Sequence, residues 1–370
     1  MKGRISHVIQ FAGACISFYI GAGFATMQEV VQYDASYGSL FPVVILVIAI
    51  IYIYTNISFA INGNRLKITR GGDIYGVYCG VFGKKFGKAA SAFFDYFSAL
   101  FCYMSFVVMC GGASSTLNQQ WGLPIGVGAV LLTIAVIITT IFGLDGIVKA
   151  LGKVGPIIIV MILFVAGITA VTGLPNLKEN MALIDSGAYS EVMEQVGSGN
   201  PIMSGASYGG FVILWFAGFM SEIGGKNKLK EVNTGMLLSA FFIFGAAATC
   251  CLALIGHIDI TAAADIPALM LAAQISPVVV QLFAIVICLG IYTSAVLLLW
   301  TGIRKFADEG TKKYKILAVA AGIVGCLIAC YIPYKGLINI IYGVNGYLGF
   351  VLVFFMVVYD MRTKMSYSCM

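Results

Sequence analysis

The chain has 370 residues, of which 60% are hydrophobic and only 10% are charged, and its mean hydropathy is +0.97. Soluble domains carry about 25% charged residues, so this composition excludes a cytosolic enzyme, a secreted disulfide scaffold and a disordered chain. Lys and Arg outnumber Asp and Glu by 22 to 16, for a net charge of +6. The sequence therefore predicts an all-α integral membrane protein of the cell membrane.

Ten long apolar runs, each bounded by charged or turn residues, predict ten membrane-spanning helices. The first five are predicted at His7–Asp34, Leu40–Asn62, Lys88–Leu117, Pro124–Phe142 and Val154–Gly173. The second five are predicted at Ala206–Gly224, Val232–Ile255, Pro277–Ile303, Ile316–Tyr331 and Gly336–Tyr359. We interpret residues 1–370 as one transmembrane transporter domain.

The loops predict the direction of the spans. With a cytoplasmic N-terminus, only Lys178 and Lys335 of the 22 basic residues fall in outer segments, as the positive-inside rule requires. Because ten is even, the C-terminus is then cytoplasmic too. We interpret the basic loops as orientation signals that face lipid headgroups, and we predict no nucleic-acid partner.

Two outer loops, 174–205 and 257–276, are longer than a connector requires. The second contains a short helical pattern, AADIPALMLAAQ. Amphipathic surface helices covering an outer vestibule would fit both loops.

The first span contains an interruption. A straight helix over its range would be ~42 Å long, whereas the hydrocarbon core is ~30 Å thick. Its middle, IGAGFATMQE at residues 20–29, has two glycines followed by Thr26, Gln28 and Glu29. Each glycine weakens a helix by about 1 kcal/mol relative to alanine. Span six repeats the pattern with WFAGFMSEIGG at residues 215–225, where Gly218 precedes Glu222.

The two interruptions lie at corresponding places in two five-helix halves, about residues 5–173 and 206–360, with the outer loop 174–205 between them. Because five is odd, the second half is inverted. Paired interrupted helices predict the central site of a secondary transporter, since unwound backbone at membrane depth must line a cavity or a ligand. The alternative is that these glycines let helices pack closely.

On three motifs, the chain resembles the YkvI family of bacterial membrane proteins: GAGFAT.QE, GLDG…KVGP before span five, and the Thr-Ser pair of span eight. The resemblance implies the amino acid–polyamine–organocation (APC) superfamily. It also implies the LeuT-type fold of five plus five inverted helices, with helices 1 and 6 discontinuous. Where the family pattern has a glycine before Gln28, this chain has Met27.

The resemblance also implies a sodium ion between spans one and eight. Its ligands would be the carbonyls of Ser17, Ile20 and Gly290 and the hydroxyls of Thr293 and Ser294. Oxygen ligands suit a hard cation, but membrane Ser and Thr also commonly bond to carbonyls of their own helix. Lys153 in LGKVGP resembles the lysine that replaces this sodium in proton-coupled members, and it is equally explained as cytoplasmic-end charge. Sodium and proton coupling both stay open.

Electrostatic potential predicts the substrate-binding residues. Freed amides would face a carboxylate at Gly21, Ala22 and Gly23, and freed carbonyls would face an ammonium near Phe18, Phe216 and Ala217. An aromatic wall or lid beside Gly218 would comprise Tyr19, Tyr103, Trp215, Phe219 and Tyr292. Packing alone also explains each ring. The dipole pair favours a zwitterion over a sugar or a phosphate.

Acidic side chains at membrane depth are costly and usually functional. Glu29 is predicted as a coupling or gating group, with an outer-gate ion pair to one of the two outer lysines as the alternative. Asp95 and Glu222 are predicted near the inner membrane face, as coupling groups or as inner-gate partners of cytoplasmic lysines. Asp34 is predicted at the outer surface.

The predicted function is a secondary active symporter that moves a small amino acid or related zwitterion by alternating access, driven by a sodium or proton gradient. The alternative is a membrane sensor on a transporter fold that binds an amino acid without moving it. The sequence lacks the HExxH, G-x-S-x-G, P-loop and paired-aspartate motifs of intramembrane or nucleotide-dependent enzymes. The ten cysteines have no metal-ligand spacing, and no cofactor is predicted besides sodium as a coupling ion.

Overall fold

The computed structural model describes residues 2–142 and 154–368. Within these ranges every regular element is helical. Eight of the described helices are long and apolar enough to cross a membrane, and two shorter apolar helices lie at Ile5–Ile16 and Val127–Ile141. The prediction of an all-helical, multi-pass membrane protein is confirmed at this level.

The predicted spans coincide with helices, which extend beyond most of them by a few residues. The elements of the first half are α1 (Lys2–Tyr19), α2 (Ala22–Ala25), α3 (Gln28–Tyr33), η1 (Ala35–Leu40), α4 (Phe41–Leu66), α5 (Asp73–Cys79), η2 (Gly80–Phe82), α6 (Lys84–Trp121), α7 (Val127–Phe142) and α9 (Val154–Gly173). Those that follow are η3 (Leu174–Asn176), α10 (Leu177–Asp185), α11 (Pro201–Lys226), α12 (Leu229–Gly256), α13 (Ile258–Thr261), α14 (Pro267–Ala273), α15 (Pro277–Arg304), α16 (Lys312–Tyr331), α17 (Tyr334–Ile338), η4 (Asn339–Val344) and α18 (Asn345–Ser368).

Local sequence determines where several long helices begin. Asn200 caps α11 by accepting hydrogen bonds from the amides of Ile202 and Met203, and Pro201 occupies the first turn. Ser276 caps α15 in the same way, again with a proline directly after the cap. A cap satisfies amides that the helix cannot, and a proline in the first turn needs no amide partner. These residues therefore fix the N-terminal ends of α11 and α15.

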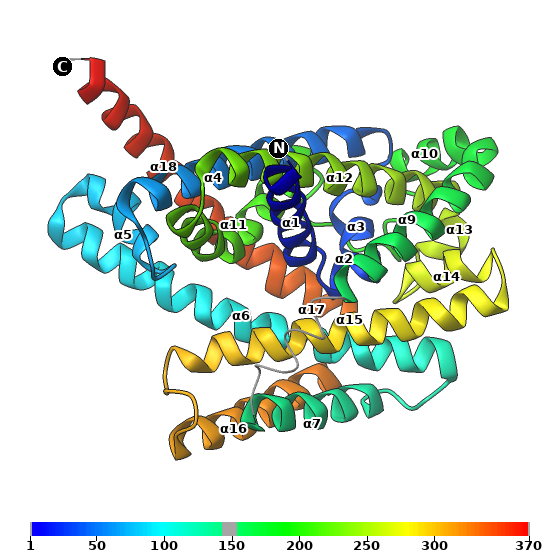
Figure 1. The fold of residues 1–370 in the computed structure, drawn as a ribbon. Helices are drawn as coiled ribbons and strands as arrows, with labels where there is room; N and C mark the ends of the chain where they lie inside the picture. The colour runs from blue at the N-terminus through cyan, green and yellow to red at the C-terminus, as the bar shows by residue number, and fades with distance from the viewer. Residues whose placement is uncertain (1, 143–153, 369–370) are drawn as a thin grey trace.

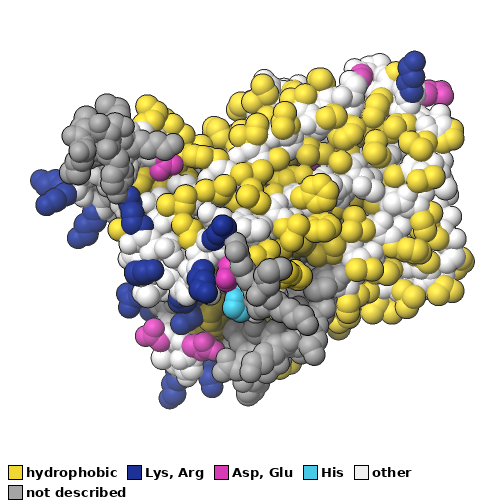
Figure 2. Space-filling view, turned by 45° about the horizontal axis from the view of Figure 1, so that its top comes forward, with side chains coloured by type: hydrophobic (Ala, Val, Ile, Leu, Met, Phe, Trp, Pro, Cys, Tyr) yellow, Lys and Arg dark blue, Asp and Glu magenta, His cyan; other side chains and the backbone are white. Residues whose placement is uncertain are grey.

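Apolar side chains cover the outside of the bundle. Ile125 and Phe241 are each 75% exposed, although both are large and hydrophobic. Figure 2 shows hydrophobic side chains over most of the visible face, while Lys and Arg side chains gather near one end. Contact of such a surface with lipid hydrocarbon costs no free energy, whereas its contact with water is unfavourable. We call the end that holds Lys67, Arg70 and Lys305 the basic end.

The long helices pack in three sets that contact one another. α11 packs against α4 and α18, and α1 packs against α12, which also contacts α9. The long helices α6 and α15 run beside each other, with α7 and α16 outside them (Figure 1). In the same view, α5 lies toward one end of the molecule, and α10, α13 and α14 lie toward the other.

The prediction of an interruption in span six is wrong. α11 is one continuous helix, and its glycines serve as contact points for neighbouring backbones. A Cβ on Gly218 would lie 3.4 Å from the Cα of Gly71, and one on Gly224 would lie 2.8 Å from the Cα of Ala60 on α4. The packing alternative therefore explains these glycines. Small residues at helix interfaces allow this close approach without unwinding.

The last span carries an irregularity that the sequence did not indicate. Between α17 and α18, residues Asn339–Val344 form a π-helix. Such wide turns in an otherwise α-helical span often occur at functional sites. This one lies next to the interrupted first span, because Tyr334 at its N-terminal side contacts Thr26.

Candidate functional site: a broken first span above a one-sided cavity

The first span is interrupted twice. At the first interruption, the amide of Gly21 donates to the carbonyl of Tyr19 (3.0 Å), two residues back instead of four. One helical turn follows, closed by the amide of Ala25 on the carbonyl of Gly21 (3.1 Å). At the second interruption, Thr26 and Met27 form a turn before α3 begins. The predicted break in span one is therefore present.

Met27 has the left-handed backbone conformation, with φ = 61°, that normally favours glycine. A non-glycine residue in this conformation costs roughly 1–2 kcal/mol. The Met27 side chain is fully buried, so its packing offsets that cost. The turn thus forms although Met27 stands where a glycine was expected, and the first span is still broken there.

A short helix in the loop 257–276 covers the break from the end opposite the basic end. The amide of Ala268 in α14 donates to the carbonyl of Thr26 (3.1 Å), and the Thr26 hydroxyl is 3.0 Å from the hydroxyl of Tyr334. The predicted helical pattern in loop 257–276 is thus present. Most of α14 is buried, however, so the expectation of a surface helix there is wrong. Carbonyls freed at the break need partners in an apolar surrounding, and α14 supplies one.

Lys335 connects the same covering segments. Its ammonium donates to the carbonyls of Ala263 (2.8 Å) and Ala262 (3.3 Å), and its own carbonyl accepts from the amide side chain of Gln32 (3.0 Å). One residue therefore joins the loop before α14, the last span and α3. It acts as a clasp across the closed end.

Replacing Lys335 by alanine is expected to loosen this closed end. Charge-assisted hydrogen bonds contribute about 1.5–3 kcal/mol each, so their loss should raise local opening of residues 262–273 and 26–33. Hydrogen–deuterium exchange read by mass spectrometry measures this directly. Lys178→Ala, at an exposed position on α10, is the matched control and should leave both segments at the wild-type rate. Equal exchange in Lys335→Ala and wild type would contradict the clasp.

A cavity of about 480 Å³ lies on the other side of the break. It reaches from Gly21 to Asp95 on α6 and Lys305 directly after α15, whose side chains are 32% and 29% exposed and form an ion pair. The cavity therefore opens at the basic end. Its wall holds the aromatic rings of Phe18, Tyr75, Trp215 and Phe219 and the glycines Gly21, Gly71, Gly72 and Gly218.

An aromatic layer closes the end of the cavity that lies away from the basic end. Trp215 lines the cavity, and its ring centroid lies 5.3 Å from Phe211, 5.9 Å from Phe101 and 6.0 Å from Tyr342. Phe211 and Tyr342 also stack on each other, at 5.0 Å. The layer brings together α6, α11 and the π-helix, so movement of any of these elements would disturb it.

Glu29 is 2% exposed and lies next to this layer, because its partner Tyr208 has its ring centroid 4.4 Å from that of Phe211. Its side chain folds back over the first span, so that a Cβ added to Gly23 would coincide with the carboxyl group. Oε2 accepts a hydrogen bond from the hydroxyl of Tyr208 (3.1 Å). Oε1 has no hydrogen-bond partner among the described residues. Neither of the two lysines predicted as its outer-gate partners pairs with it, since Lys335 is engaged by carbonyls and Lys178 is exposed on α10.

The structure brings some of the predicted substrate-binding residues to the cavity and places others elsewhere. Those that line it are Phe18, Gly21, Trp215, Gly218 and Phe219. Tyr19, Gly23, Phe216 and Ala217 are buried in the surrounding packing. Tyr103 lies on another face of α6, where its hydroxyl donates to the carbonyl of Ala321 (3.1 Å). Ala22 begins α2, next to the cavity residue Gly21.

Of the predicted ion-site residues, Gly290, Thr293 and Ser294 lie on α15, and Ser17 and Ile20 come just before α2, which packs against α15. The hydroxyl of Thr293 donates to the carbonyl of Gly290 (2.8 Å), the back-bonding that the alternative interpretation predicts. Ser294 lines the cavity, Ile20 is buried at the break, and Ser17 lies in the last turn of α1. The Thr293 hydroxyl oxygen keeps lone pairs for a cation. Lys153 lies outside the described residues.

The remaining predicted acids take up different positions. Asp95 and Glu222 line the cavity near its mouth. Glu222 pairs with Lys226 (3.1 Å) and accepts from the amide of Gly71 (2.9 Å). Asp34 is only 3% exposed, so the expectation that it lies at the surface is wrong. It is buried because η1 and α12 pack around the end of α3.

Several residues of the site were not predicted. Gly71, Gly72 and Tyr75 reach the cavity because the loop after α4 turns inward and α5 packs against α6 and α11. The sequence Gly71-Gly72-Asp73, at the start of α5, was a pattern from which a turn at this position could have been predicted. Tyr208 and Tyr342 carried no signal beyond being polar aromatic residues in apolar spans.

Comparison with known proteins gives the fold. No protein-family model matches the chain, and no curated protein matches its sequence. Among solved structures, the chain is similar to Mhp1 in an inward-facing conformation, with a TM-score of 0.61 and 14% identity over 95% of this chain and 75% of that one. It is also similar to a manganese transporter of Eremococcus coleocola, with a TM-score of 0.51 and 13% identity over 95% and 78%. The chain therefore has the LeuT-type fold of these transporters.

Proposed function

We propose that this chain is a secondary active transporter of the APC superfamily, a symporter that moves a small amino acid or related zwitterion by alternating access. One observation carries the proposal. A cavity runs from the basic end to the broken first span, while α14 covers the break from the other end. A site that is open to one side and closed to the other is what alternating access requires.

The proposal includes the topology that the fold and the loops support. The ten predicted spans form two inverted halves, one ending with α9 and the other beginning with α11, and the basic end faces the cytoplasm. The cavity would then be open to the cytoplasm. The similarity to an inward-facing conformation of Mhp1 supports this assignment.

The cavity favours a small, partly apolar substrate. Its volume of about 480 Å³ lies in the lower part of the range of 300–1,000 Å³ typical of ligand pockets. Aromatic rings line part of the cavity wall, and the buried indole Nε1 of Trp215 has no hydrogen-bond partner among the described residues. Because α11 is continuous, its carbonyls near Phe216 are used within the helix. The backbone of the first span is therefore the main source of unpaired peptide groups.

The coupling ion in this proposal is sodium or a proton. Ser294 in the cavity wall and the neighbouring Thr293 offer oxygens to sodium, and Glu29 offers a carboxyl group to a proton. Collapsing the ion gradients should abolish accumulation of substrate in vesicles. Accumulation that persists without any gradient would exclude secondary active transport.

Ligand binding can be tested on the purified protein in a thermal-shift screen of the twenty amino acids, with and without sodium. A binding amino acid at 100 times its Kd should stabilise the protein by about 2.7 kcal/mol. Gly21→Leu should remove this stabilisation, because a Cβ at Gly21 meets only Trp215, at 3.8 Å, and the larger side chain extends into the ligand space. Gly21→Ala is the matched control and should keep most of it. Equal stabilisation of wild type and Gly21→Leu would place the ligand elsewhere.

A further inference from the structure

The strongest unexplained feature is the environment of the Glu29 carboxyl group. It is buried on α3, which packs against α14, and its partner Tyr208 lies against Phe211 of the aromatic layer. One oxygen accepts from Tyr208, and the other has no partner in the part of the chain that the structure describes. An ionised carboxylate held this way would lack most of the hydrogen bonds that water provides.

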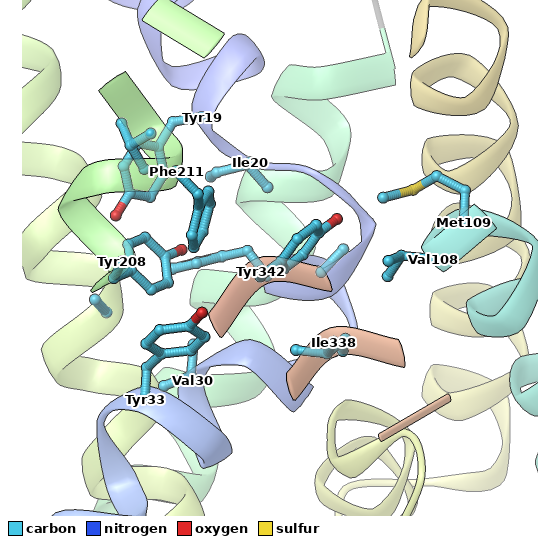
Figure 3. Packing of buried hydrophobic residues seen from close by; sticks show 14 of the residues in the cluster. Tyr19, Ile20, Val30, Tyr33, Val108, Met109, Tyr208, Phe211, Ile338 and Tyr342 are labelled. Atoms are coloured by element: carbon cyan, nitrogen blue, oxygen red, sulfur yellow. The ribbon is translucent and has the colours of Figure 1, made fainter. Parts of the chain in front are cut away.

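The groups around it come from five elements and carry no positive charge. They are Tyr19 on α1, Tyr33 on α3 with Asp34 directly after it, Tyr208 on α11, Tyr334 on α17 and Tyr342 on the π-helix. Figure 3 shows Tyr19, Tyr33, Tyr208 and Tyr342 gathered beside this stretch of the first span. The hydroxyls of Tyr33 and Tyr342 have no hydrogen-bond partner among the described residues. Asp34, a second acid, adds repulsion to any negative charge.

No described lysine or arginine forms an ion pair with Glu29. Lys335 is the basic residue of the neighbouring α17, and its ammonium is directed to loop carbonyls instead. A buried charge without a partner costs several kcal/mol, whereas a neutral carboxyl group needs only ordinary hydrogen bonds. The neighbouring tyrosine hydroxyls can both donate and accept such bonds.

From this geometry we propose that Glu29 carries a proton while its carboxyl group is enclosed, as it is in this structure, and is the residue through which a proton gradient drives transport. The inference rests on the proposed function and names the ion that this function leaves open. When the end covered by α14 opens, the carboxylate takes a proton from water there. When the aromatic layer parts, the O–H bond breaks and the proton passes to water in the cavity. One proton therefore crosses in each cycle.

The first test measures whether Glu29 is protonated, and it needs no substrate. Infrared spectra of the purified protein should show the C=O stretch of a protonated carboxyl group that Glu29→Gln removes. Glu179→Gln changes an exposed acid on α10 and is the matched control, which should keep the band. Glu29→Asp should shift the band, so the assignment does not depend on one variant. Spectra of wild type and Glu29→Gln that are identical in this region would overturn the proposal.

The second test reads coupling, in proteoliposomes supplied with a radiolabelled mixture of L-amino acids. A pH gradient, acidic on the side from which uptake is measured, should drive accumulation by wild type. In Glu29→Gln this accumulation should fall by about tenfold or more, whereas Glu179→Gln should match wild type. Accumulation driven by sodium alone, or full pH-driven accumulation by Glu29→Gln, would overturn the proposal. Absence of any wild-type transport would instead refute the proposed function, and the infrared result would then decide the protonation of Glu29 by itself.

Discussion

Replacing Gly23 by alanine is expected to reduce transport by about 100-fold while leaving expression near normal. The added Cβ would occupy the space of the Glu29 carboxyl group, which lies directly against the Gly23 backbone. The carboxyl group would then leave Tyr208, and the short helix α2 would shift relative to the cavity. Gly23→Leu should abolish binding in the thermal-shift assay for the same reason. Initial rates of amino-acid uptake in proteoliposomes measure the effect.

The matched control for this substitution is Gly13→Ala on α1. Nothing lies within 4 Å of a Cβ at Gly13, so the same chemical change in the same span meets no neighbour. It should retain wild-type transport. Comparable uptake by Gly23→Ala and Gly13→Ala would show that the contact between Gly23 and Glu29 has no functional importance.

Replacing Gly210 by alanine is expected to destabilise the folded protein by about 1–3 kcal/mol, the usual cost of overpacking. A Cβ there would collide with the carbonyl of Gly346 and lie 2.6 Å from the amide nitrogen of Phe350. Both atoms belong to the α18 backbone, which cannot move aside as a side chain could. Thermal unfolding of the detergent-solubilised protein should therefore show a lower Tm.

Gly245→Ala is the control for this second substitution. Gly245 lies in α12, is exposed, and has no atom within 4 Å of an added Cβ. Alanine is a better helix former than glycine by about 1 kcal/mol, so this variant should equal or exceed the wild-type Tm. A Gly210→Ala protein as stable as Gly245→Ala would mean that α11 and α18 do not pack through Gly210.

The helices could be predicted from the sequence because their signal is local. An apolar run bounded by charged residues marks a span wherever it lies in the bundle, and caps such as Ser276 followed by proline mark its start. Predicted and observed bounds agree for α9, and α15 differs from its predicted span by one residue.

The interrupted helices were harder to predict because glycine has two uses in a membrane span. In the first span, Gly21 precedes a real break, whereas in α11 Gly210 and Gly224 bring other backbones close. The same small side chain serves both purposes, and only the neighbouring helix decides between them. The polar residues after the glycines did not discriminate either, since Glu29 is buried and Glu222 forms an ion pair near the cavity mouth.

The rest of the site depends on contacts between distant segments. Tyr208 reaches Glu29 across 179 positions of sequence, and Tyr334 reaches Thr26 across 308. No spacing rule connects such residues, so the enclosure of Glu29 could not be inferred from the sequence. That Glu29 was singled out at all came from the high cost of placing an acid in the membrane.

The hydrogen bond between Ala268 and Thr26 has a mechanical consequence. The part of the first span that carries Thr26 cannot tilt away from α14 without exposing a peptide carbonyl where little water is available to solvate it. The loop that holds α14 must therefore move together with the first span, or the two can separate only after water has entered between them. An antibody fragment that fixed residues 257–276 in place would consequently arrest the whole cycle without touching the cavity.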